Sequence, residues 1–322
     1  MGAVRDPVAI LELDIRADLQ LVESQLRESV GSDQSLVHEA ALYLIQAGGK
    51  RIRPKLALLA GRAGDRLGPP LVSCAVSVEL IHLASLYHDD VIDETLVRRG
   101  VPTAHVRYGN DVAVLTGDFL FARSSALAAR LGPYVSERLS DTIAALCEGQ
   151  IMEGQMAGRL DVAPEHYLEV IRRKTASLIA SSCHLGAWLS GASAEIVQAL
   201  TTFGDAIGMA FQLADDILDI AAEQEESGKV PGTDIREGVL TLPALHTLEQ
   251  GGSGGDALRS ALETQDVEAA LGLLRTNGSL EFARAAVADW QRAAVDALAP
   301  IPDGPVRDAL EQVAAFIGER KS

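Results

Sequence analysis

Two segments of the chain have the spacing Asp-Asp-x-x-Asp, and each lies in a long apolar stretch. On a helix, residues four apart stack one turn apart, so each segment directs its carboxylates from one side. Crowded carboxylates repel one another, and burial of an unpaired one is costly. Mg²⁺ compensates them best, because it binds one or two carboxylates and completes its shell with water and phosphate oxygens. The candidate metal ligands are Asp89, Asp90, Asp93, Asp215, Asp216 and Asp219.

A solvated acidic helix face is the alternative interpretation of either cluster. A solvated face continues polar along its helix, whereas the residues around both clusters are apolar. The repetition of one spacing in two apolar helices therefore favours metal binding.

Basic residues gather at a few places in the chain. The run from Gly48 to Lys55 holds several cations behind a Gly-Gly pair, which lets the backbone approach a ligand closely. Arginine forks match phosphate oxygens, and lysine acts as a point charge. Taken singly, each of these residues has a plainer interpretation, a solvated surface charge or, for the histidine, a satisfied core residue. The candidates are Lys50, Arg51, Arg53, Lys55, His82, Arg98, Arg99, Lys174 and Lys229.

The overall charge is strongly negative, with 45 acidic and 28 basic residues in 322 and a formal net charge of −17. This balance argues against a nucleic-acid partner and against docking on an anionic membrane through a basic surface. Cys74, Cys147 and Cys183 lie in apolar stretches without metal-ligand spacing, so we expect reduced core thiols in a cytoplasmic protein. We find no secretory signal and no uncharged apolar run of about 18 residues, so no membrane-spanning helix is expected.

The composition is that of an all-α protein, because aromatic residues make up only 4% and Ala and Leu recur at helical spacing. We predict a single domain over residues 1–322, with residues 1–6 disordered. Residues 223–238 are charged and lack periodicity, which predicts an active-site loop, and Gly251–Gly255 predicts a flexible connector. The predicted helices are Pro7–Val30, Ser35–Gln46, one from Pro54, Leu71–Asp93, Asp111–Arg130, Tyr134–Ala157, Pro164–Ser190 and Ala194–Ala222, with three or four more between Asp256 and Ser322.

Several short motifs occur in one order across about two-thirds of the chain. They are Gly48–Pro54, His82–Asp93 with Arg98–Gly100, Gly117-Asp118, Lys174-Thr175, Phe211-Gln212 with Asp215–Asp219, and Gly228–Pro243. Together they resemble the trans-isoprenyl diphosphate synthases, the polyprenyl synthetase family. The resemblance implies a helical bundle of the isoprenoid synthase type, usually a homodimer, with the two aspartate motifs facing across a central apolar cavity.

The resemblance also implies roles for the candidate residues. The aspartates would hold about three Mg²⁺ ions on an allylic prenyl diphosphate. Residues that would bind that diphosphate directly are Arg98, Lys174 and Lys229. Residues that would bind isopentenyl diphosphate are Lys50, Arg53, His82 and Arg99. Thr175 and Gln212, with Lys174, would form the catalytic group beside the reacting carbons.

The implied reaction ionises the allylic C–O bond, joins the cation to the isopentenyl double bond and passes a proton to the departed diphosphate. Metal ions and cationic side chains stabilise the leaving group, and an apolar cavity keeps water from the cation. At most transient membrane contact is expected, for product release. One departure from the family pattern is Val239, where many members have a lysine, and Arg236 is the candidate substitute.

Product length depends on the residues four and five positions before the first motif, which are Ser85 and Ala84. In the family, large residues there form a floor under the growing chain. Because both are small here, we predict a product beyond the geranylgeranyl stage, such as a long menaquinone-type side chain. Alternatively, Phe119, Leu120 or Phe121 on a neighbouring helix blocks the tunnel, as in a geranylgeranyl or farnesyl diphosphate synthase.

Two other functions remain as alternatives. A class I terpene cyclase also uses an aspartate-rich motif with Mg²⁺, but it would lack the second Asp-Asp-x-x-Asp and the Gly-Gly-Lys-Arg run. A non-catalytic subunit of a heteromeric synthase should have lost aspartates or basic residues, and this chain keeps both.

Overall fold

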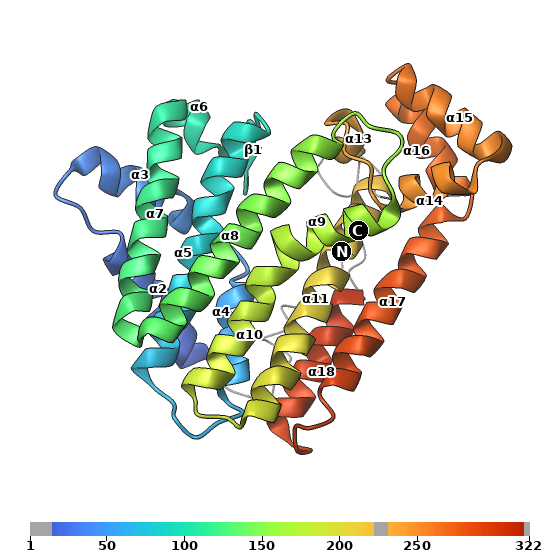
Figure 1. Ribbon diagram of the computed structural model, residues 1–322. Coiled ribbons are helices and arrows are strands. Elements are labelled where there is room, and N and C mark those ends of the chain that lie inside the picture. The colour runs from blue at the N-terminus through green and yellow to red at the C-terminus, as the bar shows by residue number, and fades with distance from the viewer. Residues whose placement is uncertain (1–14, 222–230, 319–322) are drawn as a thin grey trace. The chain divides into compact units, whose positions relative to one another are not determined.

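The computed structural model describes residues 15–221 and 231–318 (Figure 1). The predicted all-α class is confirmed, since the only strands within these ranges form one two-stranded hairpin. The chain divides into two compact units. Unit 1 is Met1–Ile143, Leu178–Thr201 and Pro300–Leu310, and unit 2 is Ala144–Ser177, Thr202–Ala299 and Glu311–Ser322.

Within the described residues, the elements follow the predicted helices closely, whereas the predicted disorder of residues 1–6 and the start of the predicted helix Pro7–Val30 lie outside them. Unit 1 contains α2 (Arg16–Ser29), α3 (Ser35–Gln46), α4 (Ile52–Gly61), α5 (Pro69–Ile92), β1 (Val97–Arg98), β2 (Val101–Pro102), α6 (Ala104–Tyr108) and α7 (Asn110–Leu131). Unit 2 contains α9 (Pro164–Ile171), the π-helix η1 (Arg172–Ala176), α13 (Thr233–Arg236), α14 (Leu242–Gln250), α15 (Gly252–Glu263), α16 (Val267–Thr276) and α17 (Ser279–Ala297). The helices with residues in both units are α8 (Pro133–Met156), α10 (Ser177–Leu189), α11 (Ala194–Ala221) and α18 (Pro305–Gly318).

Helix α5 is the core helix of unit 1. It begins at Pro69-Pro70, where proline is tolerated because the first turn has no intrahelical N–H partner. It is apolar on all sides and packs against α2, α4 and α7 (Figure 1). Gly117 of α7 lies so close to α5 that an added Cβ would fall 2.2 Å from His88 Nε2. The absence of a side chain at Gly117 therefore allows the two helices to approach beside the first aspartate cluster.

Among residues 15–221 and 231–318, two helices, α5 and α7, are long and apolar enough to cross a membrane by length and composition, which the sequence prediction did not anticipate. The criterion admits a few charged residues, whereas the prediction required an uncharged run. In α5, 72% of the apolar window is buried within the protein, as a core helix requires. In α7 the buried share is 39%, so much of its apolar surface faces outward.

Three local predictions are wrong. The segment Gly251–Gly255 is not a connector, since α15 begins at Gly252. Gly255 packs against α14, and a Cβ there would lie 3.1 Å from the carbonyl of Thr247, so close helix packing outweighs the low helix propensity of glycine. Cys147 is exposed rather than a core thiol, while Cys74 and Cys183 are buried. The predicted helix Pro164–Ser190 is interrupted by η1, whose hydrogen bonds span one more residue than those of an α-helix.

Candidate active site

The first aspartate cluster lies at the carboxyl end of α5. Asp93 is the residue that ends the helix, and Asp89 and Asp90 lie in its last turn. Asp90 has no exposed surface, and its Oδ1 lies 2.5 Å from Nε of Arg98. Burial raises the pKa of Asp90, and the charge of Arg98 opposes that shift. Its second oxygen, Oδ2, is buried without a hydrogen-bond partner in the described part of the chain.

The β1–β2 hairpin returns the chain to this cluster. Val97 pairs with Pro102 and Arg98 with Val101. The residues between them, Arg99 and Gly100, both have positive φ, 53° and 78°, as a two-residue hairpin turn requires. The turn separates the two arginines: Arg98 pairs with Asp90, whereas Arg99 Nη1 donates to the carbonyls of Leu44, at 3.1 Å, and Gly48.

The basic run begins with backbone conformations that favour glycine. Gly48 and Gly49 have φ of 85° and 153°, and Arg51, which precedes α4, has φ of 49°. A Cβ on Gly49 would lie 2.9 Å from Nη1 of Arg51 and 3.0 Å from Cζ of Arg99. Gly49 therefore lets both guanidinium groups pack against the backbone, and Lys50 is exposed beside them.

His82 and Arg53 complete this group on the inner side. Arg53 Nε is buried without a hydrogen-bond partner among the described residues. A bound anion would satisfy this donor. Burial, followed by the charges of Arg53, Arg99 and Arg98, lowers the pKa of His82 well below its usual range. His82 is therefore neutral at physiological pH and can offer one donor and one acceptor.

The second aspartate cluster lies in α11, in the part that belongs to unit 2. Asp216 is buried and accepts hydrogen bonds from the Tyr167 hydroxyl and, at 2.8 Å, from Gln212 Nε2. Thr175 Oγ1 donates to Gln212 Oε1 at 2.8 Å, so the predicted catalytic pair is joined by a hydrogen bond. Burial raises the pKa of Asp216 to about 7, and its hydrogen bonds oppose the shift.

Asp219 has a structural partner that the sequence did not predict. Its two oxygens accept from the backbone N–H groups of Thr233 and Asp234, at 3.1 and 3.2 Å, at the start of α13. Asp234 is in turn a further carboxylate near Asp216 and Asp219, on a partly exposed residue. Burial, followed by those two charges, raises its pKa to about 8. In Asp215, the remaining member of the motif, the side chain is partly exposed.

Lys174 and Thr175 lie in the π-helix η1. Such single π-turns occur frequently at functional sites. Lys174 Nζ forms an ion pair with Glu153 of α8, and both side chains are mostly buried. Gly149 allows the approach of α8 to η1, because a Cβ there would fall 2.6 Å from the backbone nitrogen of Lys174.

Two predicted features of the loop at residues 223–238 have different outcomes. Lys229 lies outside the described residues, as does the first half of the segment, while residues 233–236 form α13. Arg236, the candidate substitute for a lysine at Val239, donates to the carbonyl of Pro231 and lies 3.7 Å from Glu268 Oε1. Its guanidinium thus has partners within unit 2.

Sequence reasoning missed several charged or polar partners of the predicted residues. They are Glu23, Glu79, Glu153, Tyr167 and Asp234. Glu79 was recognisable, since it is a single carboxylate within the apolar run of α5. The others were not, because their partners come from elements far apart in sequence.

The aspartate carboxylates fit a divalent cation that takes its remaining ligands from water or from a bound phosphate. No group of three His, Cys, Asp or Glu side chains within residues 15–221 and 231–318 is already arranged to hold a metal ion. The unpartnered Asp90 Oδ2 is nevertheless a buried hard oxygen that a cation would satisfy. Such a cation would need water or phosphate oxygens to complete its shell, as Mg²⁺ does.

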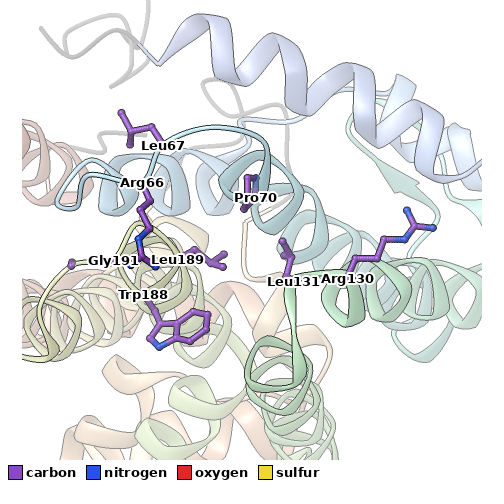
Figure 2. Close-up of a pocket in the computed structure, with 9 residues that line it drawn as sticks. Arg66, Leu67, Pro70, Arg130, Leu131, Trp188, Leu189 and Gly191 are labelled. Atoms are coloured by element: carbon purple, nitrogen blue, oxygen red, sulfur yellow. The ribbon is translucent and has the colours of Figure 1, made fainter.

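A cavity of about 560 Å³ in unit 1 lies at the other end of α5 (Figure 2). Its apolar wall includes Pro70, Leu131, Trp188 and Leu189. Asp89 comes 19 residues after Pro70, which is about 28 Å along the helix. None of the predicted site residues lines this cavity, so it is separate from the first aspartate cluster.

Comparison with known proteins identifies the class to which this arrangement belongs. Residues 34–273 match the family model for polyprenyl synthetase, and the chain belongs to that family. It is 41% identical to the nonaprenyl diphosphate synthase of Mycobacterium tuberculosis, over 99% of this chain and 94% of that protein. It is also 41% identical to heptaprenyl diphosphate synthase component 2 of Geobacillus stearothermophilus, over 94% of this chain and 96% of that protein. A crystal structure of polyprenyl synthase from Caulobacter crescentus, complexed with calcium and isoprenyl diphosphate, superposes with a TM-score of 0.91 at 34% identity, covering 100% of this chain and 99% of that one.

Proposed function

We propose that the chain is a long-chain trans-polyprenyl diphosphate synthase, a prenyltransferase that condenses an allylic diphosphate with isopentenyl diphosphate. The observation that carries this proposal is the position of two consecutive arginines. Arg98 contacts the aspartate cluster of α5, and Arg99 contacts the glycine run before α4. One hairpin turn therefore joins a group suited to a metal-bound diphosphate and a group suited to a second diphosphate, as a two-substrate condensation needs.

Mg²⁺ is the proposed cofactor, with about three ions held by the aspartates of both motifs. Asp219 is not fully free to bind an ion, since its oxygens already accept from two backbone N–H groups. When bound, the ions neutralise charge that develops on the departing diphosphate. Arg98, Lys174 and Lys229 are proposed to bind the same diphosphate directly.

The diphosphate of isopentenyl diphosphate is assigned to Lys50, Arg53, His82 and Arg99. Arg53 supports this assignment, because its buried Nε has no partner among the described residues. Neutral His82 donates one hydrogen bond without adding to the charge already supplied by the arginines.

The chemical step breaks the allylic C–O bond, and both electrons leave with the diphosphate. The isopentenyl double bond then supplies the electrons of the new C–C bond, and a proton passes to the released diphosphate. Thr175 and Gln212 hold fixed oxygen dipoles through their mutual hydrogen bond, and these are proposed to face the allylic cation. Because Gln212 Nε2 donates to Asp216, the amide cannot rotate freely and its oxygen stays in place.

The product is proposed to extend beyond the geranylgeranyl stage. Ala84 and Ser85 are small, and the two relatives described above are nonaprenyl and heptaprenyl diphosphate synthases. A homodimer is also proposed, and the exposed apolar face of α7 supports it. Leu115 is 65% and Val114 is 39% exposed on that helix, and a second copy of the chain would cover them. Light scattering coupled to gel filtration tests this, with a monomer as the contrary result.

A cytoplasmic location, with at most transient membrane contact for product release, remains part of the proposal. The cysteines support it, since Cys74, Cys147 and Cys183 are all free. Fractionation of cells that express the tagged chain tests it. Recovery in the soluble fraction is expected, and recovery in washed membranes would contradict it.

Incubation with labelled isopentenyl diphosphate, Mg²⁺ and each allylic primer in turn tests the reaction, with the products sized by chromatography. A polyprenyl diphosphate longer than geranylgeranyl diphosphate is the expected product. Consumption of primer without incorporation of label would indicate a cyclase. A product that stops at the farnesyl or geranylgeranyl stage would indicate a short-chain synthase, and no turnover by the purified chain would indicate a subunit that needs a partner.

A further inference from the structure

Arg51 differs from its neighbours in the basic run, because protein groups accept from all five of its N–H donors. Nε donates to Glu23 Oε1 at 2.5 Å and Nη2 to Glu23 Oε2 at 3.3 Å. Nη1 donates to Glu79 Oε1 at 3.0 Å and to the Gly48 carbonyl at 3.4 Å, and Nη2 also donates to the Ile45 carbonyl at 3.2 Å. A guanidinium has five N–H groups, so none is left for a ligand.

The backbone at Arg51 needs such an anchor. Arg51 has φ of 49°, in the left-handed region that a residue with a side chain occupies only when its surroundings hold it there. Its carbonyl accepts from the Lys55 N–H at 3.0 Å in the first turn of α4. The conformation of Arg51 therefore sets how Lys50, before it, and Arg53, in the first turn after it, leave the backbone.

Glu79 is the inner half of this anchor. It lies on α5 and is 1% exposed; its carboxylate pairs with Arg51, and its charge also acts on Arg53 and Arg99. Burial lowers the pKa of Arg53 and of Arg99, and in both cases the charge of Glu79 opposes the shift. Glu23 of α2 closes the outer side of Arg51, with a side chain that is 38% exposed.

We infer that Arg51, clamped between Glu79 and Glu23, is a positioning residue that holds the Gly48–Arg53 segment in the shape that binds isopentenyl diphosphate. The inference rests on the proposed function, since it concerns how Lys50 and Arg53 are presented to that substrate. It assigns Arg51 no contact with the substrate.

The two roles open to Glu79 predict changes of opposite sign. A carboxylate that only offsets the arginine charges would weaken anion binding, so its neutralisation would lower KM for isopentenyl diphosphate. A carboxylate that positions Arg51 would be needed for binding, so its neutralisation would raise that KM. The direction of the change therefore distinguishes the roles without reference to its size.

The test compares Arg51→Lys and Glu79→Gln with the wild type, with both substrates varied separately. Lysine keeps the charge but cannot span Glu23, Glu79 and two carbonyls from one ammonium. We expect KM for isopentenyl diphosphate to rise roughly tenfold in both variants, with kcat and KM for the allylic diphosphate changed less than about twofold; a tenfold change corresponds to about 1.4 kcal/mol.

Arg62→Lys is the matched control. Arg62 ends α4 and pairs with Asp18 of α2 at 2.5 Å, so it joins the same two helices at a place outside the Gly48–Arg53 segment. The KM values of the Arg62→Lys variant should match those of the wild type. A KM for isopentenyl diphosphate that is unchanged in Arg51→Lys, or lowered in Glu79→Gln, would overturn the inference, as would an equal rise in Arg62→Lys.

Folding is checked by circular dichroism and thermal unfolding. If Glu79→Gln does not fold, Glu23→Gln tests the same clamp from its partly exposed side and should raise the same KM, and an unchanged value there would overturn the inference. Failure of the proposed function would be seen separately, as a wild-type protein that does not elongate any allylic primer.

Discussion

Arg98 Nε lies 2.5 Å from Oδ1 of Asp90, and this carboxylate has no exposed surface. The pair joins the end of α5 to the hairpin that follows it. Asp89, the adjacent residue, is partly exposed instead. The carboxylate of Asp90 therefore forms an ion pair in the protein interior, where loss of its charge is costly.

Asparagine substitutions should separate the contributions of Asp89 and Asp90. Asp89→Asn should lower kcat by at least about a hundredfold, since it removes a carboxylate that is proposed to hold the metal ions on the diphosphate, and should leave stability nearly unchanged. Asp90→Asn should lower kcat and also destabilise the protein by about 3 kcal/mol, because it leaves the Arg98 charge without its buried partner. Steady-state kinetics and urea unfolding measure the two effects. Equal stability of the two variants would contradict the assignment.

Product length should respond to Ser85 more cleanly than to Ala84. Ala84 is 0% exposed, whereas Ser85 is partly exposed and its hydroxyl donates back to the His82 carbonyl at 2.9 Å. The variant Ser85→Phe should therefore give a shorter product without unfolding the protein. The variant Ala84→Phe should overpack the core, at a cost of about 1–3 kcal/mol. Chromatography of the prenyl products and thermal unfolding of both variants provide the measurements. A full-length product from Ser85→Phe would place the floor elsewhere.

The close contact between α10 and α4 predicts opposite effects for two helical glycines. A Cβ on Gly186 would fall 2.1 Å from the carbonyl oxygen of Ala57, which is backbone and cannot rotate away. Gly186→Ala should destabilise the protein by more than about 1 kcal/mol. A Cβ on Gly272 of α16 would have no neighbour within 4 Å, so Gly272→Ala should stabilise by about 0.5–1 kcal/mol. Urea unfolding of both variants tests the pair, and stabilisation by Gly186→Ala would be the contrary result.

His184 predicts a dependence of stability on pH. Thr201 Oγ1 donates to the Val197 carbonyl, so it accepts from His184 Nδ1, and Nε2 accepts from the Tyr134 hydroxyl at 2.6 Å. Burial, then the charge of Arg138, lowers the pKa of His184 from 6.5 to about 4. Between these values the unfolded chain binds a proton that the folded chain does not. This contribution to stability is therefore present above pH 6.5 and decreases as the pH falls towards about 4.

The measurement compares wild type with His184→Gln, which keeps a polar side chain but cannot titrate. The free energy of unfolding is determined in urea at about pH 7 and about pH 5. The wild type should lose more stability on acidification than the variant. His82 contributes with the same sign in both proteins, so an equal loss would show that His184 does not titrate as described.

Most of the helices were predictable because apolar periodicity is a local property. The core helix was expected over Leu71–Asp93 and found over Pro69–Ile92, so the first aspartate motif was placed correctly at its end. The break at η1 was not predictable in the same way. A π-turn leaves the composition helical and changes only which N–H bonds to which carbonyl.

The site residues show the same division. The carboxylates and arginines were identified from residue type and spacing, which reflect the chemistry they do. Their partners were not, since Arg51 and Glu23 are 28 residues apart and Tyr167 and Asp216 are 49 apart. Sequence could therefore suggest that Arg51 is one of several phosphate-binding cations, whereas the fold gives all of its donors to protein groups.

The π-helix at Arg172–Ala176 and the α-helix before it should respond differently to a change of length. Deletion of one residue within the π-helix would allow ordinary α-helical bonding from α9 into α10 without rotating one helix against the other, because the wide turn accommodates one extra residue. Deletion of one residue of α9 after Tyr167 would instead rotate Tyr167 by about 100° about the helix axis and turn it away from Asp216. Homologous chains that vary freely in the length of their surface turns should therefore keep a constant number of residues between Tyr167 and the π-helix.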